Sequence, residues 1–65
     1  MRVVVNGEPR ETAANTLQEL LEECGYHGTH FATAVNEEFI HKQQRAAQVL
    51  DQGDRVEVVA PMEGG

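Results

Sequence analysis

Two glycines at the end of the sequence, Gly64 and Gly65, are the residues with the most distinctive chemistry in this chain. They carry a terminal α-carboxylate on a stalk without side chains, which can enter a channel too narrow for a Cβ atom. A carboxylate is a poor electrophile until it is activated as a mixed anhydride, such as an acyl-adenylate made with ATP. A thiol or persulfide can then displace AMP. We therefore predict that the carboxylate of Gly65 is the reactive group and that Gly64 is required sterically.

A metal site is the other chemistry that residue spacing suggests. Cys24, His27 and His30 follow one another at Cys-x2-His-x2-His spacing. Zinc normally takes about four ligands, and His41 is the only further histidine. Cys24 also falls on the apolar stripe of a predicted helix, where a free cysteine packs as a small apolar residue. We therefore predict no metal site and no catalytic thiol.

The length of the chain argues against an enzyme. Its 65 residues suffice for one small domain, and a domain of this size buries only about 60% of its unfolded surface. One helix can pack on one sheet, but an enclosed active site has no room. We predict a carrier or substrate protein without catalytic residues. Its partner would supply the ATP site and the nucleophile, so we expect no bound cofactor.

The charge balance indicates which partners the chain can bind. Eleven acidic residues against five basic ones give a formal net charge of −6. Nucleic acids and anionic membrane surfaces are bound through basic faces, so we expect neither. A protein with a basic docking face is the natural complement, although acidity can also simply keep a small domain in solution. One cysteine, no apolar run of membrane-spanning length and no signal-peptide pattern indicate the cytoplasm.

The first residues predict a β-hairpin. Residues 2–5 are rich in valine and are typical of a strand. Asn6-Gly7 then predicts a type I′ turn, which needs positive φ at both central positions. The returning strand, residues 8–12, contains Pro9, which lacks an N–H donor and so belongs at the edge of a sheet.

A helix is predicted next. Thr16 as N-cap and Glu19 reaching back to it fit a capping box, and Gly25 stands where a left-handed C-cap belongs. Between them the apolar residues recur at helical spacing and form one stripe. These residues are Leu17, Leu20, Leu21 and Cys24.

The second half of the chain predicts three more strands. The expected elements are a strand over 31–36, a turn at Glu37-Glu38, a short strand at Phe39-Ile40, a loop over 41–50 with room for one helical turn, a turn over 51–54 and a strand over 55–60. In the last strand Val56 and Val58 alternate with Arg55 and Glu57, which indicates one buried face.

This order of elements predicts an α+β fold of the β-grasp, or ubiquitin-like, type. With this order, a mixed sheet of about five strands with one main helix packed on one face buries the apolar stripe of the helix against the apolar face of the sheet. The first and last strands would lie side by side and parallel in the middle of the sheet. We predict one domain over residues 1–60 and a flexible tail with the two glycines over residues 61–65.

One face of the sheet would remain uncovered by the helix. Val4 and Val59 point to that face, and Phe39 and Met62 could join them. Isolated exposed valines are common on strands. An apolar cluster beside the tail would also suit partner docking, which is the interpretation we favour.

Five segments along the chain form a recognisable set: Val-Asn-Gly-Glu at 5–8, Thr-Leu-Gln-Glu-Leu-Leu at 16–21, Ala-Val-Asn-Glu-Glu-Phe-Ile at 34–40, Asp-Gln-Gly-Asp-Arg-Val-Glu-Val-Val at 51–59 and the final Gly-Gly. With these segments the chain resembles the ThiS family of sulfur carriers of thiamine-thiazole biosynthesis. It implies that an E1-like, ThiF-like adenylyltransferase activates Gly65 with ATP. Sulfur from a donor such as a cysteine desulfurase would make the thiocarboxylate, and a ThiG-like thiazole synthase would take the sulfur. Only Gly64 and Gly65 carry over as functional residues.

Other functions share the same tail. The Pro-Met-Glu-Gly-Gly ending is also similar to the MoaD family of molybdopterin carriers, whose chains are usually longer, and a related carrier for another sulfur pathway is a further alternative. A ubiquitin-like modifier would begin with the same adenylation, and an interaction domain with an inert tail is a third alternative. ThiS relatives often have Pro-Arg near residues 42–43, where this chain has Lys42-Gln43, so part of the docking surface differs.

Overall fold

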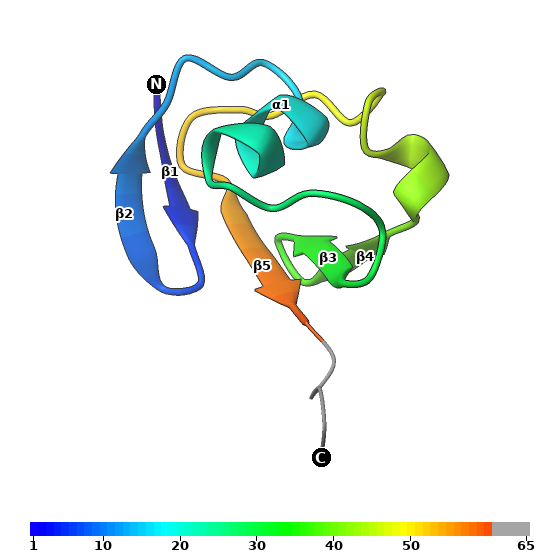
Figure 1. Cartoon of the computed structure of the whole chain (residues 1–65). Coiled ribbons are helices and arrows are strands. Elements are labelled where there is room, and N and C mark those ends of the chain that lie inside the picture. Colours follow the sequence, from blue (N-terminus) through cyan, green and yellow to red (C-terminus); the bar gives the residue numbers. More distant parts are fainter. Residues whose placement is uncertain (61–65) are drawn as a thin grey trace.

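The computed structural model describes residues 1–60, so the predicted tail with Met62, Gly64 and Gly65 lies outside the described residues. The elements are β1 (Arg2–Val5), β2 (Glu8–Glu11), α1 (Leu17–Glu23), β3 (Ala32–Val35), β4 (Glu38–Ile40), a 3-10 helix η1 (Lys42–Gln44) and β5 (Arg55–Val59) (Figure 1). The five predicted strands and the predicted helix are all present. η1 is the helical turn expected between residues 41 and 50.

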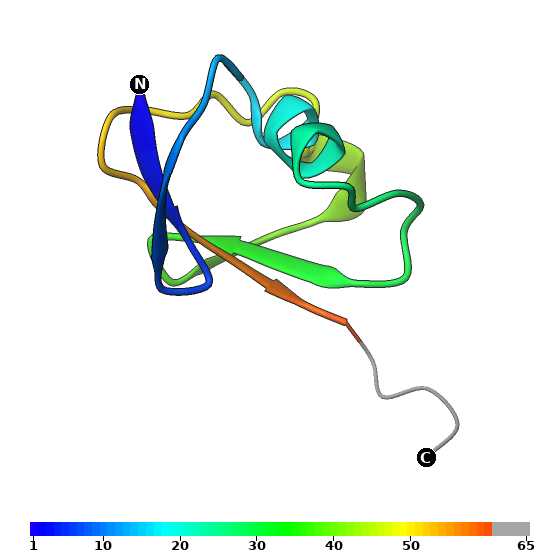
Figure 2. The ribbon, with the colours of Figure 1, turned by 60° about the vertical axis from the view of Figure 1, so that its left-hand side comes forward.

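The strands form one mixed sheet in the order β2-β1-β5-β3-β4. β1 and β5 run parallel, with Val5 beside Val56, and the other neighbours are antiparallel. α1 lies across one face of the sheet and leaves the other face open (Figure 2). This is the predicted β-grasp arrangement, with the first and last strands adjacent near the centre of the sheet.

The apolar core fills the layer between α1 and the sheet. Leu17, Leu20 and Leu21 come from one stripe of α1 and are almost fully buried. The rest of the core comes from the sheet and the loops: Val3, Ala14, Val35, Ile40, Leu50, Val56 and Val58. Cys24, the last residue of the predicted stripe, is only half-buried. Within residues 1–60, no helix is long and apolar enough to cross a membrane.

The first hairpin forms as the sequence predicts. Asn6 and Gly7 have φ of 50° and 84°, the left-handed conformation that a type I′ turn requires at both positions. The register places Val5 opposite Glu8 and Val4 opposite Pro9. β2 is an edge strand, which agrees with the missing N–H of Pro9.

The ends of α1 are capped, with one difference from the expected capping box. The Thr16 hydroxyl accepts the Glu19 N–H at 3.2 Å, as predicted for the N-cap. The Glu19 carboxylate accepts the N–H of Asn15, at 2.8 Å, rather than that of Thr16. At the other end Gly25 has φ of 90°, and Tyr26 donates its N–H to the Leu21 carbonyl at 2.8 Å, which completes a Schellman motif.

The second hairpin turns one residue earlier than predicted. The turn consists of Asn36 and Glu37, with φ of 51° and 71°, and β4 begins at Glu38. A two-residue turn with both φ values positive matches the twist of the strands, and asparagine tolerates this conformation well. The predicted strand over 31–36 is accordingly shorter, because Asn36 belongs to the turn.

Candidate functional site

β5 leads into the segment that contains the predicted reactive end. Its last residue is Val59, and Ala60 is the last described residue before that segment. β5 lies in the centre of the sheet, between β1 and β3 (Figure 1). Its pairing with β3 continues to its final residue, since Val59 lies opposite Ala32.

Two asparagines at the hairpin turns bind β5 through their side chains. The main-chain N–H of Asn6 donates to the Val56 carbonyl at 2.9 Å, and the side-chain Oδ1 of Asn6 accepts the N–H of Val58 at 2.8 Å. Because β1 has already ended, this side-chain oxygen replaces the next main-chain acceptor of a parallel ladder. Asn36 acts at the beginning of β5, where its Oδ1 accepts the N–H of Arg55 at 3.0 Å.

The sequence reasoning missed this function of both asparagines. It treated Asn6 as a turn residue and placed Asn36 in a strand. The available signal was the repetition itself, since an asparagine follows a valine-containing strand in each hairpin. Asparagine supplies both the left-handed backbone and a side-chain acceptor, whereas glycine supplies only the backbone.

Two residues of the predicted docking patch lie in one groove. Phe39 and Val59 have 58% and 66% of their surface exposed, and both line a groove of about 540 Å³. Val4 is half-buried, lies beside Arg55 and lines a different hollow. Met62 lies outside the described residues. The structure thus places Phe39 and Val59 in one groove and Val4 in a different hollow.

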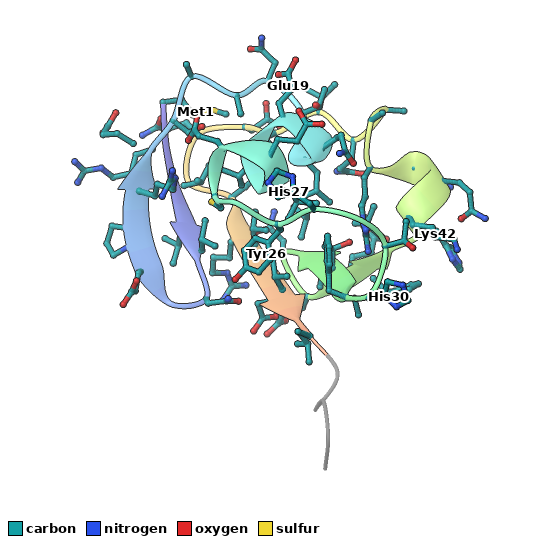
Figure 3. The ribbon with its side chains drawn as sticks, in the orientation of Figure 1. Met1, Glu19, Tyr26, His27, His30 and Lys42 are labelled. Atoms are coloured by element: carbon teal, nitrogen blue, oxygen red, sulfur yellow. The ribbon has the colours of Figure 1, made fainter. Side chains whose placement is uncertain are left out.

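The groove combines apolar and basic side chains. Its lining residues are Thr29, His30, Phe31, Ala32, Phe39, His41, Lys42, Gln43, Arg45 and Val59. The ring of His41 packs edge-on against that of Phe39, with their centroids 4.8 Å apart. His30 and Lys42 lie on the same side of the molecule, on the loop before β3 and on η1 (Figure 3). Of the acidic residues within the described range 1–60, none is among these lining residues.

Arg45 is the buried charge of this region and was not predicted from the sequence. Only 3% of its surface is exposed. Its Nε donates to the Thr33 hydroxyl at 3.1 Å, and its Nη2 donates to the Phe31 carbonyl at 2.6 Å. The guanidinium also stacks over the Phe31 ring, 4.4 Å from the centroid. Desolvation by burial lowers the pKa of Arg45 from its ordinary value.

The residues with metal-like spacing do not form a cluster. Cys24 is the C-cap of α1, and His27 and His30 are exposed on the loop that follows. Figure 3 shows His27 beside α1 and His30 apart from it, toward η1. Among residues 1–60, no three histidine, cysteine, aspartate or glutamate side chains are grouped to hold a metal ion.

Comparison with known proteins adds sequence relatives. A curated protein from Thermus thermophilus, named sulfur carrier protein ThiS, is 44% identical over 63 residues, which cover 97% of this chain and 98% of that protein. A thiazole synthase from Paramagnetospirillum magneticum is 36% identical over 66 positions. The match covers all of this chain but only 20% of the synthase.

Solved structures and a family model give the same result. The crystal structure of the thiamine biosynthesis protein ThiS from Geobacter metallireducens matches with a TM-score of 0.83, at 26% identity and with full coverage of both chains. A solution structure of a thiamine biosynthesis protein from that organism gives 0.80 and covers 88% of its chain. The sequence model of the ThiS family matches residues 3–65. The chain belongs to the ThiS family.

Proposed function

We propose that this protein is the sulfur carrier that supplies thiazole formation in thiamine biosynthesis. The observation that carries this proposal is the match to the ThiS family along residues 3–65, which includes both terminal glycines. The relative named as a sulfur carrier aligns over 98% of its own length, so the likeness extends beyond a shared fold.

The proposed chemistry takes place at the carboxylate of Gly65. A carboxylate oxygen attacks the α-phosphorus of ATP, and pyrophosphate leaves. The terminal sulfur of a persulfide on the donor then attacks the acyl carbon, and AMP leaves. A second thiol of the donor cleaves the resulting acyl disulfide, which releases the thiocarboxylate and leaves a disulfide on the donor. Gly64 is the residue that the narrow approach to this carbon requires.

In this proposal the carrier has no catalytic side chain. The partners are an E1-like adenylyltransferase that binds the ATP, a sulfur donor such as a cysteine desulfurase, and a thiazole synthase, all in the cytoplasm. The synthase from Paramagnetospirillum magneticum supports the last partner, because one of its segments is similar to the whole of this chain. A carrier segment and a synthase in one polypeptide are consistent with sulfur transfer between them.

We further propose that Phe39 and Val59 form part of the surface that docks on the adenylating enzyme. Both are exposed apolar residues on the open face of the sheet, and Val59 lies directly before the last residues of the chain. Contiguous exposed apolar surface is typical of interaction sites. Val4 lines a different hollow and is a weaker candidate, and Met62 is a candidate by sequence position alone.

Intact-mass measurement tests the sulfur-carrier proposal. After incubation with the adenylating enzyme, ATP and a sulfur donor, the mass should rise by the difference between one sulfur and one oxygen atom. Deleting Gly65, or adding one residue after it, should abolish this change while leaving the circular-dichroism spectrum intact. Sulfur transfer by either variant would refute the proposal. Covalent attachment to other proteins would instead favour a ubiquitin-like modifier.

A further inference from the structure

Arg45 is a buried cation without an anionic partner in the described part of the chain. The ion pairs among residues 1–60 involve the N-terminus, Arg2 and Arg10, and none involves Arg45. Its hydrogen bonds go to a hydroxyl and a carbonyl, which do not neutralise the guanidinium. Buried charges are normally paired, because removing an ion from water is costly unless an opposite charge compensates.

The guanidinium still has donors to offer. Arginine carries five N–H donors in a planar fork, and the two hydrogen bonds of Arg45 use only Nε and Nη2. No hydrogen bond joins Nη1 to the residues that the structure describes. Because no buried side-chain nitrogen among them lacks a partner, Nη1 is the solvent-accessible part of this otherwise buried side chain. Arg45 also lines the groove, so an acceptor that enters the groove can approach these free N–H groups.

The rest of the groove points to an anion carried on an apolar group. Lys42 adds a second cation and His30 and His41 add imidazole rings, and no acid from residues 1–60 lies in the lining. Phe39 and Val59 supply apolar surface in the same hollow. A polyphosphate or a nucleic acid would leave that apolar surface unused and would be repelled by the net charge of −6. A single carboxylate beside apolar side chains matches both parts of the groove.

We propose that this groove binds an aspartate or glutamate side chain, flanked by apolar residues, from the protein that receives the tail. The incoming carboxylate accepts hydrogen bonds from the Arg45 guanidinium and is attracted by Lys42. Its apolar neighbours cover Phe39 and Val59. The proposal rests on the proposed function only for the identity of the partner, because the groove itself is lined by described residues between Thr29 and Arg45 and by Val59.

The charge pattern gives this groove a role in selecting partners. A basic partner is attracted by the acidic body as a whole, but only a partner with an acid at this point satisfies Arg45. A partner with a lysine there would place two cations together beside a buried guanidinium, which is unfavourable. The groove thus restricts which of several basic proteins can dock close to the end of β5.

Titration of the ¹⁵N-labelled full chain with short peptides tests the proposal. The probe is acetyl-Leu-Asp-Phe-amide at neutral pH, and the matched peptide has Asn in place of Asp. We expect amide shifts at Phe31, Ala32, Phe39, His41 and Val59 with the Asp peptide. The Asn peptide should bind about tenfold more weakly, because it lacks the charge that strengthens a hydrogen bond to arginine.

Two charge-reversal variants localise the effect without disturbing Arg45, whose removal could unfold the chain. Lys42→Glu should weaken the binding of the Asp peptide at least severalfold. Arg2→Glu makes the same change in net charge away from the groove and should leave this binding unchanged. Equal binding of the Asp and Asn peptides, equal effects of the two variants, or no shifts at the groove would overturn the proposal. Inorganic phosphate that shifts the same amides and binds more tightly than the Asp peptide would also overturn the proposal, because it would indicate a small-anion site. None of these measurements uses Gly65, so failure of sulfur transfer is a separate result.

Discussion

Replacing Asn6 by glycine tests the side-chain hydrogen bond that holds the end of β5. Glycine adopts the φ of 50° found at Asn6, so the type I′ turn should persist. The substitution removes the side-chain oxygen that accepts the Val58 N–H at 2.8 Å, together with a longer, exposed hydrogen bond from Nδ2 to the Tyr26 hydroxyl at 3.5 Å. Asn36→Gly is the matched control, because Asn36 has φ of 51° at the same turn position but binds the beginning of β5 instead.

The size of the effect follows from the position of the bond. A neutral hydrogen bond contributes about 0.5–1.5 kcal/mol, and a donor left unsatisfied in a buried place costs about 1–3 kcal/mol. The bond to Val58 is partly buried. We therefore expect Asn6→Gly to lose about 1–2 kcal/mol of the free energy of unfolding. Asn36→Gly should lose less, since its side-chain bonds to Arg55 and Asp54 are exposed.

Residue-resolved hydrogen exchange separates this local effect from general destabilisation. In Asn6→Gly the exchange rate of the Val58 amide should rise about tenfold above its rate in the parent, in addition to any rise that all β5 amides share because the whole fold is less stable. A loss of about 1.4 kcal/mol corresponds to this factor of ten. In Asn36→Gly the Arg55 amide should respond and that of Val58 should not. Equal protection of Val58 in the two variants would refute the assignment of this bond to the Asn6 side chain.

Three other changes test the docking surface, the electrostatics and the core. Val59→Asp should lower the rate of adenylation by the partner enzyme, and an unchanged rate with an intact fold would remove Val59 from the docking surface. A hydrogen bond from the Thr12 hydroxyl and, after it, the interaction with Arg10 lower the pKa of Glu23. The ionised carboxylate therefore stabilises the fold at neutral pH, and this contribution is lost as the pH falls through the lowered pKa. Urea denaturation should accordingly find Glu23→Gln less stable than the parent at pH 7 but equal to it in strong acid; a difference that persists in acid would contradict this origin. Leu20→Ala should lower the free energy of unfolding, measured by urea denaturation, by about 2–5 kcal/mol because it leaves a cavity at a buried position of the core. A smaller loss would mean that the neighbouring side chains move to fill the cavity.

The sequence sufficed for the fold because its local signals agree with one another. Asn6-Gly7 determined the first hairpin, and Pro9 correctly placed β2 at the edge of the sheet. The helix has the predicted N-cap at Thr16, and Gly25 has the predicted left-handed conformation directly after the C-cap residue Cys24. Each of these signals depends on residues close in sequence, so each can be interpreted without knowledge of the tertiary contacts.

The misplaced turn had a different cause. Glu37-Glu38 was predicted as the turn, and Asn36 as the end of the strand before it. The observed turn places Glu37, a residue that rarely has positive φ, at 71°. Tertiary pairing imposes this conformation, because Val35 must lie opposite both Glu38 in β4 and Val56 in β5.

The groove could not be predicted because its parts are distant in sequence. Arg45 lies in a segment without clear periodicity, and nothing near it in the sequence indicates burial. Its partners Thr33 and Phe31 belong to β3 and to the loop before it. Val59 joins them only through the pairing of β5 with β3. The sequence therefore predicted exposed apolar residues on this face but could not show the buried cation beside them.

The central position of β5 connects the fold to the proposed chemistry. An enzyme that draws the final residues into a narrow channel exerts a pull on the strand that precedes them. An edge strand would resist through one ladder of hydrogen bonds, whereas β5 is held by β1 on one side and β3 on the other. β1 is too short to reach the end of β5, and the Asn6 side chain extends that ladder to Val58. The body can then stay folded while the carboxylate is activated, which explains why an asparagine is more useful than a second glycine at this turn.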